Sequence, residues 1–238
     1  MNARLIFDIE TIGDNWDEMD KTTQKALTYW LKKEAYSEDA YSAAMANVKN
    51  ELGFSPYTGQ IVAIGVLEVE TNKGAVYYQA PEKPAEDFEE DGIKYKVLSE
   101  KAMLEKFWQG AINYTEFVSF NGRGFDVPFL MIRSAVNGIK PTKDLLSNRY
   151  LSNQKFNALH IDLMDQLTFY GAVQRRPKLH MVCRAFGIKS PKEDGVDGDE
   201  INPLFKAREY LKIAKYNAAD LRATREAYKK WEEFLNVK

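Results

Sequence analysis

The stretch that decides the fold lies near the start of the chain and reads LIFDIET, residues 5–11. Side chains in a β-strand alternate between two faces, so Asp8 and Glu10 point to one face while Phe7 and Ile9 point to the other. Two neighbouring carboxylates at the end of a core strand repel each other and lose hydration. The pattern therefore predicts one of three things at this place: a divalent cation, a basic partner, or a strand end that runs out into water.

The composition of the chain bears on these alternatives. The chain has 238 residues, is 45% hydrophobic, and carries one cysteine, two histidines and a net charge of −2. One cysteine excludes an intrachain disulfide framework and a cysteine-based zinc site, and two histidines disfavour a histidine-rich metal centre. Oxygen ligation remains, which suits Mg²⁺, Mn²⁺ or Ca²⁺. The net charge provides no general positive field, so a polyanion would need local basic patches or metal.

The hydrophobic segments are short. No stretch approaches 18 consecutive apolar residues, so the sequence predicts no membrane span. The first strand begins at about residue 3, which leaves no room for a signal peptide. Together with the single cysteine, this predicts a cytoplasmic protein, and nothing in the sequence indicates a protein partner.

The hydrophobic pattern along the chain indicates an α/β fold with a mixed sheet of five or six strands flanked by helices. We expect a single domain over residues 1–238, in which residues 14–55 form a helical insertion after the first strand. Residues 81–92 are expected to form an exposed acidic loop. The predicted strands are 3–9, 60–70, 75–80, 116–120 and 158–163, and the predicted helices are 99–112, 127–137, 178–187 and 204–235.

Two further segments carry carboxylates. In NGRGFDVPFL, residues 121–130, Asp126 follows a short apolar strand and a turn with two glycines. It stands at the start of a helix, where a carboxylate is equally explained as an N-cap. In YNAAD, residues 216–220, Tyr216 and Asp220 are four residues apart and share one face of the predicted helix. Taken alone, that pair fits an ordinary surface contact.

Taken together, FDIET, NGRGFD and YNAAD resemble, in order and spacing, the three motifs of the DEDD 3′–5′ exonucleases of the ribonuclease H-like fold, with a tyrosine four residues before the last aspartate. The chain looks most like free-standing proteins related to the exonuclease domain of family B DNA polymerases. Supporting segments are SPYTGQIVAIGV, LHIDLMD, KLHMVCRAFGIKSPKEDGVDGDEI and YNAADLRATREAY. The resemblance extends from about residue 4 to residue 230.

The resemblance implies a nuclease that uses two divalent cations, Mg²⁺ or Mn²⁺, to hydrolyse DNA from its 3′ end and release nucleoside 5′-monophosphates. It favours single-stranded DNA as substrate. The catalytic residues would be Tyr216 and four metal-binding carboxylates, and three further residues would contact the substrate. By that resemblance, the carboxylates are Asp8, Glu10, Asp126 and Asp220, and the substrate contacts are Thr11, Asn121 and Phe125.

Two other functions remain open at this point. The same chemistry serves an exoribonuclease, because the choice of sugar depends on contacts to the 2′-hydroxyl. A non-catalytic nucleic-acid-binding module could also retain the fold, although all four carboxylates and the tyrosine are present. Asp162 is as readily structural as part of the site, His160 is expected to be a satisfied core or edge histidine, and Cys183 a small core residue. We expect the helical insertion to line or cover the substrate groove.

Overall fold

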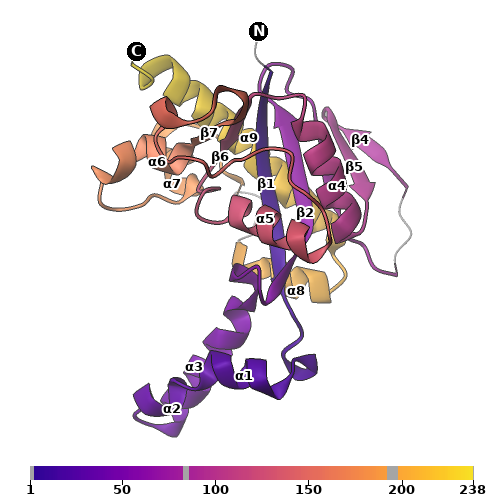
Figure 1. The fold of residues 1–238 in the computed structure, drawn as a ribbon, viewed down its shortest axis with the longest axis vertical. Helices are drawn as coiled ribbons and strands as arrows, with labels where there is room; N and C mark the ends of the chain where they lie inside the picture. Colours follow the sequence, from indigo (N-terminus) through magenta and orange to yellow (C-terminus); the bar gives the residue numbers. More distant parts are fainter. Residues whose placement is uncertain (1–2, 83–85, 192–197, 238) are drawn as a thin grey trace.

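The computed structural model describes residues 3–82, 86–191 and 198–237. A seven-stranded mixed sheet forms its centre, in the order β4-β5-β3-β2-β1-β6-β7 (Figure 1). β1 lies inside the sheet, antiparallel to β2 and parallel to β6. This confirms the α/β ribonuclease H-like architecture. The strands are β1 (Arg4–Gly13), β2 (Gly59–Glu68), β3 (Gly74–Tyr78), β4 (Phe88–Glu90), β5 (Ile93–Val97), β6 (Glu116–Ser119) and β7 (Leu159–Asp162).

The sheet has more strands than the five or six expected, because β4 lies in the segment predicted as an acidic loop and β5 lies in residues for which no strand was predicted. This strand pairs antiparallel with β5, which in turn pairs parallel with β3. All three residues of β4 are exposed, and Phe88 stacks on Tyr95 with ring centroids 4.7 Å apart. A three-residue edge strand with two glutamates has little strand propensity of its own. It forms because its neighbour offers backbone partners, which the local sequence does not reveal.

Helices cover both faces of the sheet and enclose two separate apolar clusters (Figure 1). On β1, Phe7 and Ile9 join the cluster under α4 and α5, whereas Ile6 and Ile12 join the cluster under α9. None of the helices in the described part of the chain combines the length and apolar character needed to cross a membrane. The helices on the body are α4 (Glu100–Ala111), α5 (Asp126–Val136), α6 (Leu163–Leu167), α7 (Leu179–Phe186), α8 (Ile201–Lys206) and α9 (Tyr210–Phe234).

The inserted segment forms an arm of three helices that projects from one end of the body (Figure 1). The chain leaves the sheet at Gly13 and re-enters at Gly59, and these two residues face each other in the β1–β2 ladder. Leu31 is buried but belongs to neither cluster of the body, so it packs within the arm. The arm comprises η1 (Trp16–Glu18), α1 (Lys21–Thr28), α2 (Leu31–Glu34), α3 (Glu38–Glu51) and η2 (Leu52–Phe54). The two or three helices expected here are confirmed.

The long helix α9 approaches the sheet closely at one point. Gly65 of β2 pairs with Asp8 of β1, and α9 places the buried side chain of Asn217 over that glycine. A Cβ atom on Gly65 would lie 1.9 Å from Asn217 Oδ1, far inside contact distance. Because Gly65 has no side chain, α9 can pack beside the carboxylates of β1.

We predict that Gly65→Ala lowers the free energy of unfolding by about 2 kcal/mol, because overpacking a tight core contact costs energy of that order. Chemical denaturation would measure it. Gly110→Ala is the matched control, since a Cβ there meets no atom within 4 Å and alanine is the better helix former. Equal effects of the two substitutions would contradict the proposed role of Gly65.

Candidate active site

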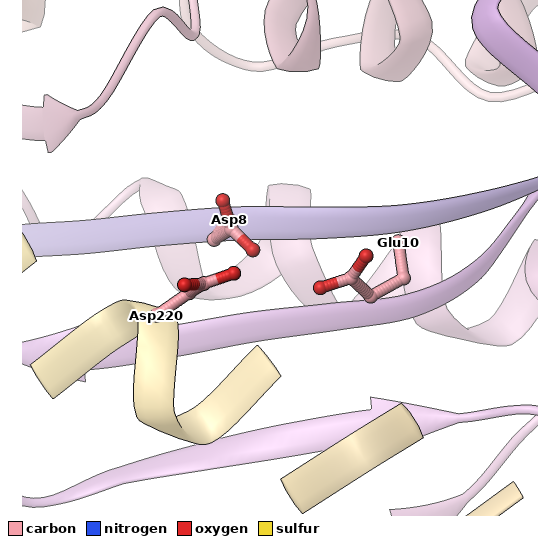
Figure 2. Close-up of side chains that lie close together, drawn as sticks. All are labelled: Asp8, Glu10 and Asp220. Carbon is pink, nitrogen blue, oxygen red and sulfur yellow. The ribbon is translucent and has the colours of Figure 1, made fainter. Parts of the chain in front are cut away.

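Three carboxylates meet where β1 crosses α9. Each of Asp8, Glu10 and Asp220 offers an oxygen atom, and these oxygens lie within 4.8 Å of one another. Figure 2 shows the three side chains turned toward one another, two from the strand and one from the helix. Glu10 is buried, and Asp8 and Asp220 are partly exposed. The strand period predicted that Asp8 and Glu10 share a face, and the structure adds Asp220 from more than 200 residues away.

Asp126 borders this group from the other side of β1. It is the first residue of α5, is buried, and its Oδ1 accepts a hydrogen bond of 3.0 Å from the backbone N–H of Ile9. The N-cap position of the helix belongs to Phe125, whose side chain makes no capping bond. The carboxylate of Asp126 is thus tied to β1 and is not a helix cap. It lies outside the group of three within 4.8 Å, but its charge acts on Asp8.

The electrostatics of the site favour a bound cation. Burial, followed by the negative charges of Asp126, Glu10 and Asp220, raises the pKa of Asp8 well above its usual value. Burial and the charge of Asp220 likewise raise the pKa of Glu10. The pKa of Asp126 is raised to about 7, mainly by burial. Carboxylates held together in this way gain most from a positive charge between them.

Asn217 also belongs to the site, although it is not among the site residues predicted from the sequence. The residue is fully buried, and its Nδ2 donates a 2.7 Å hydrogen bond to Asp8 Oδ2, which lowers the pKa of Asp8 against the other effects. Its position was a usable signal, because Asn217 interrupts the apolar line of Ile213 and Leu221 at helical spacing. A polar residue on the buried face of a helix needs a polar partner.

Two buried atoms within the site lack hydrogen-bond partners among the described residues: Glu10 Oε1 and Asn217 Oδ1. Unsatisfied buried acceptors are rare and call for an explanation. Asn217 Oδ1 packs against Gly65, whereas a hard divalent cation would satisfy Glu10 Oε1, because such ions take carboxylate oxygens. The residues present therefore fit Mg²⁺ or Mn²⁺, the metals expected from the sequence.

Tyr216 stands one helical turn before Asp220 on α9, as the spacing predicted. Its side chain is half-buried and hydrogen-bonded to Asp220. Burial and the negative charges of Asp220, Glu10 and Asp8 raise the pKa of its phenol above the usual value. At neutral pH the hydroxyl is therefore protonated and can donate or orient a hydrogen bond.

The three residues expected to contact substrate lie around the base of the arm and the turn before α5. Thr11 Oγ1 donates a 2.7 Å hydrogen bond to the carbonyl of Gly53, and Thr11 lines a cavity of about 430 Å³. Phe125 meets Phe54 edge to face, with centroids 6.5 Å apart. The arm thus touches the site at both residues. The other residues around the cavity are Asn47, Asn50, Glu51, Gly53, Phe54, Gly198, Asn202 and Pro203.

Asn121 sits in the turn that joins β6 to α5, in the left-handed region with φ of 64°. Asp162 holds this turn: its two carboxylate oxygens accept hydrogen bonds from the backbone N–H groups of Asn121 at 2.8 Å and Arg123 at 2.9 Å. Gly122 is needed there because a Cβ would lie 2.2 Å from Ser119 Oγ. Asp162 therefore positions the turn, which agrees with the structural alternative for this residue.

His160 and Cys183 have the structural roles expected of them. His160 is buried, with Nδ1 bonded to the carbonyl of Leu145 and Nε2 to the hydroxyl of Ser119. Burial lowers its pKa to about 4, so it is neutral and fixed in place. Cys183 is fully buried in the described structure.

Comparison with known proteins agrees with this geometry. Residues 55–235 match the model of a family described as predicted 3′–5′ exonucleases related to the exonuclease domain of PolB. The matched range includes Asp126, Tyr216 and Asp220 and begins after β1, which carries Asp8 and Glu10. A search of curated proteins finds no match.

One solved structure that matches is the family B DNA polymerase from the hyperthermophilic archaeon Pyrobaculum calidifontis, with a TM-score of 0.60 and 16% sequence identity. The alignment covers 99% of this chain and 25% of the polymerase, so the chain spans about a quarter of that protein's length. At this identity the likeness establishes the shared fold.

The raised pKa of Asp126 predicts how pH changes stability in the absence of metal. Its carboxyl titrates near 3.9 in the unfolded chain and near 7 in the folded one, so the stability that it contributes is present at low pH and is lost as pH rises from about 4 to about 7. We expect Asp126→Asn, which keeps the acceptor for Ile9, to gain stability over the original protein across this range in EDTA.

Chemical denaturation of both proteins at several pH values would measure this difference. Glu233→Gln, an exposed site on α9, serves as the matched control. If the stability curves of the original protein and Asp126→Asn stay parallel across the range, the proposed titration of Asp126 is wrong.

Proposed function

Since the chain belongs to the family of predicted 3′–5′ exonucleases related to the exonuclease domain of PolB, we propose that it hydrolyses phosphodiester bonds at the 3′ end of DNA. We further propose that the DNA is single-stranded and that the products are nucleoside 5′-monophosphates. The observation that carries the proposal is the group formed by Asp8, Glu10 and Asp220, with Asp126 beside it. Such an assembly of buried carboxylates suits a cation-dependent phosphoryl reaction.

The four carboxylates would hold two divalent cations, Mg²⁺ or Mn²⁺. When bound in pairs, such ions lower the pKa of a coordinated water and stabilise the attacking and leaving oxygens of an in-line displacement. Asn217 fixes one oxygen of Asp8 through its hydrogen bond, which leaves the other free for ligation. The protein thus supplies a preorganised set of oxygen ligands.

Tyr216 is proposed to orient the attacking water. The hydroxyl is anchored by Asp220 and its pKa is raised, so the phenol acts as a neutral hydrogen-bonding group and not as a phenolate base. The proton of the water would leave to solvent or to a neighbouring carboxylate.

The substrate end is proposed to lie over the base of the arm. Thr11 and Phe125 would contact the terminal nucleotide, since both adjoin η2, and Asn121 would contact it from the neighbouring turn. The cavity beside Thr11 is polar on its arm side, where Asn47 and Asn50 of α3 line it. We therefore propose that residues 1–238 act as one exonuclease domain in which the arm forms part of the substrate site.

The proposal predicts that the purified protein shortens a 5′-labelled single-stranded DNA from its 3′ end in Mg²⁺ or Mn²⁺, but not in EDTA. Asp8→Asn should reduce the rate by at least about a hundredfold, because it removes one charge from the ligand set while conserving shape. Gel electrophoresis of the labelled ladder would show both effects. A protein that binds DNA but cleaves neither DNA nor RNA would contradict the exonuclease and favour a binding module.

An RNA strand of the same sequence, run in parallel, separates the deoxyribonuclease from the exoribonuclease. Faster shortening of RNA than of DNA would overturn the proposed substrate and retain the chemistry. Asp39→Asn, an exposed aspartate on the arm, is the matched control for charge removal and should keep full activity.

Replacing residues 15–51 by a short glycine–serine linker tests the arm. Asp14 N–H donates to the carbonyl of Thr58 at 2.8 Å, and Leu52 lies against Gly13, so the two ends of the arm are already close. We expect the shortened protein to fold and to bind single-stranded DNA more weakly. Fluorescence anisotropy and circular dichroism would measure affinity and fold. Unchanged affinity in a folded protein would refute a role of the arm in substrate binding.

A further inference from the structure

A groove runs along α9 beside the active site. Its first part is a cavity of about 450 Å³ that has Tyr216 in its wall. A second cavity of about 240 Å³ adjoins it, and the two share Pro191 and Ala219. The small side chain of Ala219 therefore lies at the junction of the two cavities. The groove continues the active site outward, because Tyr216 belongs to both.

Basic side chains follow this groove. Lys212 and Lys215 line the first cavity, and Lys189 and Arg222 line the second. Lys212 is exposed, and its side-chain ammonium makes no ion pair or hydrogen bond with any residue that the structure describes. Lys215 is half-exposed and pairs with Glu90 of β4 at 2.9 Å. Two carboxylates, Glu209 and Glu226, also line the groove.

The placement of Lys212 ties the groove to the reaction. Lys212, Tyr216 and Asp220 follow one another at intervals of four residues, so they lie on one face of α9, each about one helical turn from the next. A strand whose scissile phosphate lies at Asp220 and Tyr216 would pass Lys212 next. Leu211, which is 40% exposed beside it, offers an apolar surface to a sugar or base.

We propose that this groove binds the sugar–phosphate backbone of the single strand on the 5′ side of the scissile bond, with Lys212 contacting a phosphate. The inference rests on the proposed exonuclease function and adds a second binding site to it. Cations beside an apolar wall are the usual means of holding single-stranded nucleic acid. Exposed lysines are common, so continuity with Tyr216 distinguishes this groove from an ordinary solvated helix face.

Lys212→Ala tests the groove with two substrates. A labelled dodecamer of deoxythymidine has a strand on the 5′ side, whereas the p-nitrophenyl ester of thymidine 5′-monophosphate has none. We expect about threefold weaker binding of the dodecamer by anisotropy and a salt-dependence slope smaller by about 0.7. Hydrolysis of the nitrophenyl ester should be unchanged. Lys230→Ala, an exposed lysine near the end of α9, is the matched control and should alter neither substrate.

We expect Glu90→Gln to change the affinity for the dodecamer in the opposite direction. It releases Lys215 from its ion pair, so the dodecamer should bind more tightly, again with no effect on the nitrophenyl ester. If Lys212→Ala and the original protein bind the dodecamer with equal affinity, the proposed role of the groove is wrong. Loss of ester hydrolysis in Lys212→Ala would also overturn it, because the lysine would then act at the reacting centre.

The experiment separates this proposal from the proposed function. If the original protein hydrolyses neither substrate, the exonuclease fails. The binding measurements, which do not require cleavage, still decide whether the groove holds a strand.

Discussion

Repulsion between buried carboxylates is the constraint on which the site depends. Two unit charges about 4.8 Å apart repel by roughly 3 kcal/mol at an effective dielectric constant of about 20, and this site brings three carboxylates to that separation with a fourth beside them. Such an arrangement persists only if the surrounding structure holds it rigidly. Burial, and after it this repulsion, raises the pKa values of Asp8, Glu10 and Asp126. A divalent cation bound between the carboxylates would relieve this repulsion, so the same negative charges favour cation binding.

The fold supplies the rigidity from both sides of the sheet. β1 is paired on both edges, and its apolar side chains enter two different clusters, so the strand that carries Asp8 and Glu10 cannot shift. The hydrogen bond from Ile9 to Asp126 uses the same strand to place the fourth carboxylate. On the opposite face, Gly65 allows α9 to approach until Asn217 reaches Asp8. Packing and the hydrogen bonds from Ile9 and Asn217 thus set the positions of the carboxylates, and their interactions with one another do not.

Much of this could be predicted from the sequence where the signal is local. The alternation in LIFDIET predicted that Asp8 and Glu10 share a face, and helical spacing predicted that Tyr216 and Asp220 lie together. What failed depends on distant partners. β4 exists because β5 pairs with it. The sequence left open whether Asp126 caps its helix, and the contact with Ile9 joins residues 117 positions apart in the chain. The role of Asn217 depends on Gly65, which lies 152 positions earlier in the chain and pairs with Asp8. No local sequence pattern shows that Asn217 packs against this glycine.

The pairing of the end of β1 with the start of β2 explains why a large insertion is tolerated so near the carboxylates. Gly13 and Gly59 face each other across the β1–β2 pair, so a segment of any length can be inserted between them without altering the register that places Asp8 opposite Gly65. Closing a longer loop costs little additional entropy. β1 nevertheless ends only three residues after Glu10, at Gly13, and η2 brings the arm back onto Thr11 and Phe125. Strand pairing thus keeps the insertion from moving the carboxylates, while the arm forms part of the surface that a substrate would meet. The sheet therefore holds the carboxylates in place, while the arm supplies part of the surface beside them.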